Sequence, residues 1–200
     1  QNHTVLRLEK IMDIEYKHED LIAIAKKYMS TIQDSRHNIH HMNDVVAYTK
    51  ELLNELETKK NPEVCMIGAY WHDVGRIKLD VGHEELSAKM LRQHMLEMNY
   101  DDEFIEACCE AIRYHKWNMS PKTIEGLIIK DADKLAFLGS ERWSACLEQG
   151  QRLDDIIQLL PRLRNELLYF EVSRKIYDRE IVRIMRLLYD RYYGDRREKE

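Results

Sequence analysis

Glycine, proline and cysteine are scarce in this chain. Its 200 residues contain seven Gly, three Pro and four Cys, the last at positions 65, 108, 109 and 146. So few glycines and prolines argue against a β-sandwich, a β-propeller or a long disordered linker. The cysteines form no CxxC pair and two of them are adjacent, a pattern typical of reduced thiols, so we expect a cytoplasmic protein.

A basic excess and a long apolar run are also missing. The 31 Lys and Arg residues stand against 36 Asp and Glu residues, which gives a formal net charge of -5. Nonspecific binding to nucleic acid is therefore not expected. No apolar run approaches the roughly 18 residues of a transmembrane helix, so no membrane partner is expected. Because the chain begins with Gln1 rather than Met, the sequence leaves open whether its natural N-terminus is present.

Apolar residues instead follow a helical period along nearly the whole chain. One buried stripe runs from Asn43 onward, and Asn61 followed by Pro62 starts another helix. Further helices are predicted over residues 84–99, 101–114, 121–138, 153–170 and 171–193, and no run alternates with the two-residue period of a strand. Gly194 is the expected C-cap of the last helix. We predict an all-α protein with an N-terminal segment (1–17), a core (18–140), C-terminal helices (141–194) and a charged tail (195–200).

Histidine is the most informative residue type among the nine copies that the chain contains. His3, His18 and His94 have polar sequence neighbours and are predicted to be surface residues. The other six fall at helix boundaries or on apolar stripes: His37, His40, His41, His72, His83 and His115. His72 directly precedes Asp73 at the point where a helix is predicted to end. Adjacent helical residues point about 100° apart around the helix axis, so at a helix end these two side chains can converge on one ion.

A second charged motif interrupts an apolar helix. Asp131 and Asp133 lie between Lys130 and Lys134, with apolar residues on both sides. An unpaired buried carboxylate is costly, so both need partners. One interpretation pairs them with the two lysines along the helix. The functional interpretation brings Asp133 together with His41, His72 and Asp73 around a divalent metal.

Taken together, these motifs resemble the HD-domain superfamily of metal-dependent phosphohydrolases. The matching segments are HNIHHMNDV (37–45), AYWHDVGRI (69–77) and IIKDADKLAFLG (128–139), with GHEELSAKML (82–91) and IRYHKWN (112–118) between them. The resemblance covers about residues 20 to 140, in order and in spacing. It implies a single HD-domain helical bundle, with its site between core helices and additional C-terminal helices packed on it.

The resemblance also implies a metal-ligand set. The family's first metal His falls on His41, its His-Asp pair on His72 and Asp73, and its closing Asp on Asp133, with Asp131 as the alternative register for that last ligand. His83 and His115 match the extra histidines of dinuclear members, in which Asp73 would bridge two ions. The alternatives are a surface residue at a helix start for His83 and a cation at a helix end for His115.

Three departures from the family pattern narrow the choice of activity. Asn43 and Asp44 stand where many relatives carry an Arg. Arg76 stands where nucleotidase-like members carry an acidic residue, which weighs against a simple 5'-nucleotidase. The stretch HKWNMSPKTIEG lacks the Gly-Tyr-Pro signature of the cyclic-dinucleotide branch, which weighs against that branch.

The expected site chemistry follows from the donor types. Imidazole and carboxylate ligands suit one or two ions of Mn, Fe, Co, Ni or Zn better than Mg. Attack at phosphorus builds negative charge that waiting cations must stabilise. We therefore predict Asp73, Arg76 and Lys134 as catalytic residues, and we predict Arg36, His37 and Lys78 as substrate-binding residues. For Arg76 and Lys78 the alternative is favourable placement at a helix C-terminus. Asp131, Glu84 and a histidine outside the metal shell stay open as general acid or base.

The leading hypothesis is a divalent-metal-dependent phosphohydrolase that cleaves a small phosphate ester, a nucleotide or related metabolite, with a metal-activated water. Aromatic residues beside the histidines, among them Trp71 and Trp117, would stack a base or pack in the core. One alternative is an HD-fold oxygenase that holds two irons, as inositol oxygenase does with a His and Asp ligand pattern that this sequence resembles. The other is a non-catalytic nucleotide-binding domain that signals through the C-terminal helices, which are long and apolar enough to form a homodimer.

Overall fold

The computed structural model describes the backbone of residues 2–193, together with the side chains of residues 9, 11–139 and 142–186. Over this range the chain is helical and contains no strand, so the predicted all-α fold is confirmed. The α-helices are α1 (Asn2–Lys17), α2 (Glu19–Met29), α3 (Ile39–Glu55), α4 (Pro62–Trp71), α5 (His83–Glu97), α6 (Asp102–Arg113), α7 (Ile124–Ala136), α8 (Ser140–Glu148), α9 (Leu153–Arg162) and α10 (Glu171–Tyr193). A 3-10 turn, η1 (Val74–Ile77), and a π-helical turn, η2 (Leu163–Leu167), complete them.

Local capping explains where the helices differ from the predicted boundaries. α3 begins at Ile39 rather than after residue 42, because the Asn38 side chain accepts hydrogen bonds from the backbone N–H groups of His40 and His41. α7 begins only after Thr123, whose side chain caps the N–H of Gly126. The predicted helix 153–170 is interrupted by η2, next to a proline inside α9. α8 was not predicted, and Gly194 and the tail 195–200 lie outside the described residues.

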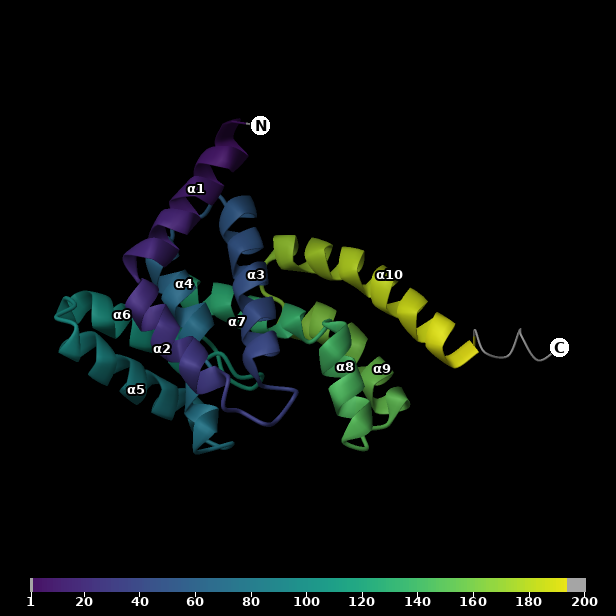
Figure 1. Cartoon of the computed structure of the whole chain (residues 1–200). Coiled ribbons are helices and arrows are strands. Elements are labelled where there is room, and N and C mark those ends of the chain that lie inside the picture. Colours follow the sequence, from purple (N-terminus) through teal and green to yellow (C-terminus); the bar gives the residue numbers. More distant parts are fainter. Residues whose placement is uncertain (1, 194–200) are drawn as a thin grey trace.

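The core is built around α4. Its segment from Val64 to Trp71 is buried at every position, because α1, α2, α3, α6 and α7 all pack against it (Figure 1). Gly68 allows α7 to approach closely, since a Cβ at that position would lie 2.1 Å from Cδ1 of Ile129. Trp71 packs in this core and donates its indole N–H to the carbonyl of Leu21 at 3.2 Å. These contacts hold the end of α4, where His72 follows, in one position.

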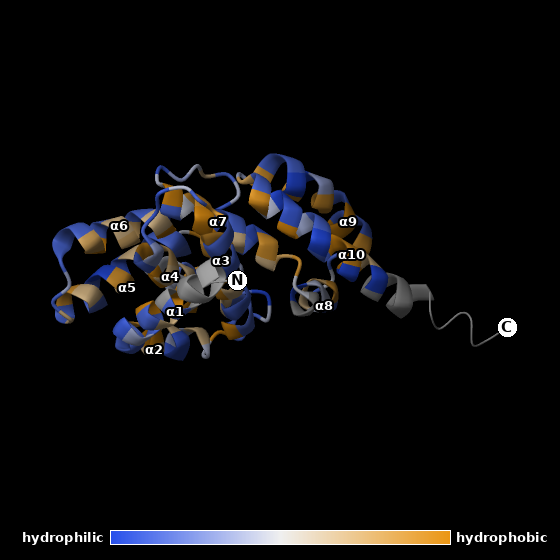
Figure 2. Cartoon of the chain, turned by 90° about the horizontal axis from the view of Figure 1, so that it is seen from above, coloured by the Kyte–Doolittle hydropathy of each residue, from blue (hydrophilic) through white to orange (hydrophobic). Residues whose placement is uncertain are grey.

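The C-terminal helices α8, α9 and α10 lie together on one side of the core, opposite α5 and α6 (Figures 1 and 2). One link between them and the core is the ion pair of Arg179 in α10 with Glu51 in α3, at 2.6 Å. Another is Asp131 of α7. Its carboxylate accepts hydrogen bonds from the backbone N–H of Tyr169 at 2.9 and 3.1 Å and from that of Phe170 at 3.0 Å, just before α10. Asp131 therefore binds the start of α10 rather than the neighbouring lysines. The boundaries at residues 17, 140 and 194 stay a prediction.

Two of the three histidines predicted to lie on the surface are buried or half-buried instead. His18 is buried, with Nδ1 2.8 Å from the Tyr100 hydroxyl and Nε2 2.9 Å from the Glu63 carboxylate, so its prediction was wrong. His94 is half-buried and lies against the rings of Tyr28 and Trp71. The side chain of His3 lies outside the described residues. Among the described helices none combines the length and apolarity needed to cross a membrane.

Candidate metal centre

Six elements bring the predicted ligands to one place inside the bundle. His41 lies in the first turn of α3, His72 caps the end of α4, and Asp73 leads into η1. His83 is the first residue of α5, His115 follows α6, and Asp133 lies on α7. All of these side chains are buried except that of Asp133, which is 13% exposed. The helix ends therefore converge at the depth where a small ion would be shielded from bulk water.

The first group of donors is formed by His41, His72 and Asp133. Nε2 of His41 lies 3.1 Å from Oδ1 of Asp133 and 3.4 Å from Nε2 of His72. Oδ2 of Asp73 lies 3.7 Å from both imidazoles, so this carboxylate closes the group on its other side. The ligand atoms of His41, His72 and Asp133 all lie within 4.8 Å of one another.

The second group shares Asp73 with the first. Oδ1 of Asp73 lies 3.0 Å from Nε2 of His83 and 3.5 Å from Nε2 of His115, and the two imidazole nitrogens are 3.4 Å apart. Oδ2 of Asp73 also lies 3.3 Å from Nδ1 of His37, which makes a third triad with His41. Asp73 thus presents one oxygen to each group.

The backbone fixes the tautomer of three of these histidines. Nδ1 of His72, His83 and His115 lies 2.9, 2.8 and 2.7 Å from the carbonyl oxygens of Ala69, Asp80 and Ile112. A carbonyl oxygen can only accept, so each Nδ1 carries the proton and each neutral ring directs the lone pair of Nε2 into the cluster. This is the arrangement that a metal-binding imidazole requires.

Burial and charge set the protonation of the first group. Burial lowers the pKa of His41 to about 3 and that of His72 to about 4, so both rings are neutral at neutral pH. Burial alone would raise the pKa of Asp73 and Asp133. The neighbouring imidazoles, and Lys134 in the case of Asp133, outweigh it and hold both pKa values well below the usual range. Neutral imidazoles and ionised carboxylates are the forms that bind metal.

The donor set fits a divalent ion by a further observation. Oδ1 of Asp73 is buried and has no hydrogen-bond partner among the described residues. Nε of Arg76 lies 2.9 Å away as an ion pair, yet it too is buried without a hydrogen-bond partner. Buried polar atoms are nearly always satisfied in native proteins, so an unsatisfied carboxylate oxygen facing two imidazole lone pairs indicates a cation site.

The comparison with protein families assigns this architecture. A model described as the HD domain matches residues 38–138. The chain belongs to the HD-domain family. That match contains His41, His72, Asp73, His83, His115 and Asp133, so the buried donor groups that can hold a divalent metal belong to the HD domain itself.

Two solved structures have the same fold as this HD protein. A predicted HD superfamily hydrolase from an uncultured Thermotogales bacterium is 21% identical, with a TM-score of 0.66, over 89% of this chain and 92% of that one. Bacillus subtilis YpgQ, solved in complex with ADP, is 17% identical, with a TM-score of 0.66, over 90% of this chain and 98% of that one. No curated protein matched the sequence.

The remaining predicted residues of the HD site lie at different distances from the cluster. Lys134 is buried, forms an ion pair with Asp133 and donates to the carbonyl of His115 at 3.2 Å. Arg36 is held by Asp34 through two contacts of 3.0 Å. Lys78 is exposed and lines none of the described cavities. Of the candidates for general acid or base, Asp131 caps α10, and Glu84 pairs with Lys116 at 2.7 Å.

Sequence reasoning missed Arg142 of α8. Its Nη1 donates to Nδ1 of His41 at 3.1 Å and to the carbonyl oxygen of Arg36. His41 therefore accepts at Nδ1 and carries its proton on Nε2, unlike the other three rings. In the sequence, Arg142 is only a basic residue 101 positions away from His41, in a segment where no helix was predicted. Its proximity to the site depends on how α8 packs.

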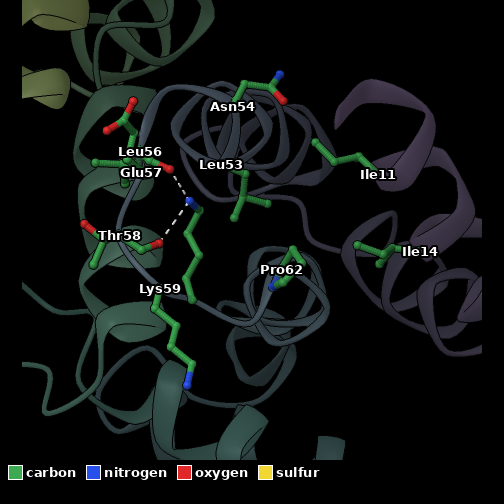
Figure 3. Close-up of a pocket in the computed structure, with 10 residues that line it drawn as sticks. Ile11, Ile14, Leu53, Asn54, Leu56, Glu57, Thr58, Lys59 and Pro62 are labelled. Carbon is green, nitrogen blue, oxygen red and sulfur yellow. Dashed lines mark hydrogen bonds between the residues drawn. The ribbon is translucent and has the colours of Figure 1, made fainter. Parts of the chain in front are cut away.

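A cavity of about 430 Å³ adjoins the cluster. His37 and Arg142 line it and also contact the donor groups, so the cavity and the metal centre share a wall. A second cavity of about 270 Å³ lies between α1, the end of α3 and the start of α4, where the Lys60 ammonium donates to backbone carbonyls (Figure 3). None of the cluster residues lines this second cavity, so of these two cavities the first is the one that adjoins the HD site.

Proposed function

We propose that the chain is a divalent-metal-dependent phosphohydrolase that cleaves a small phosphate ester, a nucleotide or related metabolite. The observation that carries the proposal is the position of Asp73. Its two buried oxygens face separate sets of imidazoles, from His41, His72 and His37 on one side and from His83 and His115 on the other. His41, His72, Asp73 and Asp133 would hold one ion, and His83 and His115 would hold a second one with Asp73.

The charges around the cluster support an anionic substrate. Three cations, Arg76, Lys134 and Arg142, lie at the donor groups beside Asp73 and Asp133, while His41 and His72 are neutral. Arg76 also pairs with Asp80 at 2.6 Å, so these fixed charges balance before any divalent ion binds. A bound divalent ion would make the site positive, and because phosphoryl transfer concentrates negative charge on the oxygens of phosphorus, that charge would favour its transition state. The ADP bound to the structurally similar YpgQ supports a nucleotide.

The residues of the chain have separate parts in this activity. A divalent ion bound by the donor set lowers the pKa of a coordinated water toward about 7 and polarises a phosphoryl oxygen. Arg76 and Lys134 orient Asp73 and Asp133 through their ion pairs and stabilise charge on the phosphoryl group. The imidazole and carboxylate donors favour Mn, Fe, Co, Ni or Zn over Mg. We place the activity in the cytoplasm because the buried cysteines are all free thiols.

The test is elemental analysis of gently purified protein combined with phosphate release from a panel of nucleotides. We expect wild type to carry about two transition-metal ions per chain and His83→Ala about one. Asp73→Ala should lose both the metal and the phosphate release. Asp154→Ala is the matched control, since Asp154 is exposed on α9, pairs with Arg152 and belongs to none of the donor groups. Phosphate release by Asp73→Ala at the wild-type rate would refute the proposal, and full occupancy by iron without phosphate release would favour an oxygenase.

A further inference from the structure

Arg142 has fewer partners than a guanidinium in its position needs. The side chain is half-buried, and its Nε is buried without a hydrogen-bond partner. Its remaining polar contacts are made by Nη1, to the carbonyl oxygen of Arg36 and to Nδ1 of His41, and no described carboxylate forms an ion pair with it. A cation so placed is stabilised by an anion, and a guanidinium is the donor best shaped for phosphate.

One of these contacts conflicts with a loaded metal centre. Arg142 donates to Nδ1 of His41, which leaves the proton of that ring on Nε2. Nε2 is the atom that faces Asp133 and His72, and it must be free of its proton to bind an ion. When His41 becomes a ligand, Arg142 therefore loses an acceptor. It then needs a new one on its open side.

That open side is the cavity of about 430 Å³, which Arg142 lines. Arg36 lines it too, but its guanidinium is already held by both oxygens of Asp34. Arg142 is thus the lining cation that has no carboxylate partner among the described residues. Lys134, which is committed to Asp133, does not line the cavity.

The cavity also contains an apolar patch beside its polar groups. Trp117 is 39% exposed and meets Phe137 edge to face, with ring centroids 6.3 Å apart. Ile156 and Leu159 of α9 also line the cavity, and Asp155 of the same helix adds a hydrogen-bond acceptor. Half of the lining residues are polar or charged, so these aromatic and aliphatic side chains form an apolar patch in a mixed cavity, against which a planar ring can pack.

We propose that Arg142 is a substrate-binding residue that holds a phosphoryl oxygen, and that the cavity beside it accepts the aromatic base of a nucleotide. The proposal rests on the proposed function, because the reacting phosphorus would lie at the metal centre. Arg142 lies outside residues 38–138 that match the HD-domain model, and so do Ile156 and Leu159. The C-terminal helices would accordingly select the substrate while the HD domain supplies the ligands.

Three probes separate the parts of this site in a titration that needs no turnover. They are methylene-bridged ADP, methylenediphosphonate and adenosine, each titrated calorimetrically into Mn²⁺-loaded protein. Arg142→Gln should weaken the two phosphonates by about 10- to 100-fold, as expected for lost hydrogen bonds to a charged group, and leave adenosine unchanged. Arg142→Lys should recover part of that loss. Trp117→Ala should weaken methylene-bridged ADP and adenosine but not methylenediphosphonate.

The control is Arg162→Gln, which removes an exposed arginine of α9 that pairs with Glu166. This variant should bind all three probes as wild type does. Melting curves would establish that each variant is folded. Equal affinity of wild type and Arg142→Gln for both phosphonates would overturn the proposal, and so would wild type binding neither. If the protein binds the probes as expected but does not hydrolyse nucleotides, only the proposed function is refuted. The titration measures binding and does not depend on hydrolysis.

Discussion

Gly75 is where the structure makes its sharpest quantitative prediction. It follows Asp73 by two residues and donates its N–H to Oγ of Ser87 at 2.8 Å. A Cβ at position 75 would lie 2.2 Å from the carbonyl oxygen of His83 and 2.8 Å from the backbone nitrogen of Ser87, whereas real Cβ atoms essentially never come closer than 3.0 Å. In Gly75→Ala the start of α5 must therefore move away from η1 by about 0.8 Å or more.

Both stability and metal binding should respond. Overpacking of this kind costs about 1–3 kcal/mol, which lowers the melting temperature by roughly 2–12 °C for a chain of this size. The displaced carbonyl belongs to His83, whose Nε2 lies 3.0 Å from Oδ1 of Asp73. Metal–ligand distances normally lie within about 0.2 Å of their standard values. If His83 and His115 hold an ion with Asp73, as proposed, Gly75→Ala should weaken or abolish its binding.

The assay is thermal melting of the metal-free protein together with Mn²⁺ titration. Gly68→Ala is the matched control, because its Cβ would meet Cδ1 of Ile129, the end of a flexible side chain in the core, rather than backbone. It should lower stability and keep the wild-type number of bound ions. If Gly75→Ala melts and binds Mn²⁺ as wild type does, the close approach of η1 and α5 does not position His83, and the reasoning is refuted.

Acid should destabilise the metal-free protein before its carboxylates titrate. His41 and His72 have pKa values lowered to about 3 and about 4 by burial, whereas an unfolded His titrates near 6.5. The stabilisation that the two neutral rings contribute is complete above about pH 6.5 and is lost as the pH falls toward 4, by a few kcal/mol in total. Urea unfolding at pH 7, 5.5 and 4.5 measures this loss, and equal free energies of unfolding at the three pH values would contradict the prediction. Asp131→Ala should cost about 2 kcal/mol or more, because the N–H groups of Tyr169 and Phe170 lose their acceptor. Limited proteolysis should then cut between α9 and α10 faster than in Asp131→Asn, whose amide oxygen still accepts, and identical cleavage of the two variants would argue against this link.

The sequence predicted those helices whose ends are marked by residues close by in the chain. Asn61 and Pro62 begin α4, and the helix predicted over residues 171–193 is α10. The resemblance to the HD family named the donor groups that the bundle does bring together. These features depend on residues near one another in the sequence, or on motifs in a fixed order, so they could be found without coordinates.

The features that sequence reasoning missed depend on tertiary packing. His18 looked like a surface residue because its neighbours are polar, yet Tyr100 and Glu63 approach it from distant elements and satisfy both of its nitrogens. Asp131 and Asp133 are two residues apart on one helix, and only the positions of α10 and His41 show that they serve different purposes. Arg142 reaches His41 through a helix that had no predicted role.

The attachment of α10 to the core has a consequence for how this protein can change over evolutionary time. Asp131 grips main-chain N–H groups of Tyr169 and Phe170, not their side chains. Every amino acid except proline offers that group, so the joint places almost no demand on the identity of the residues it holds. Substitutions at this joint can therefore accumulate without loss of the attachment, whereas the ion pair of Arg179 in α10 with Glu51 in α3 ties the same helix to the core through specific side chains.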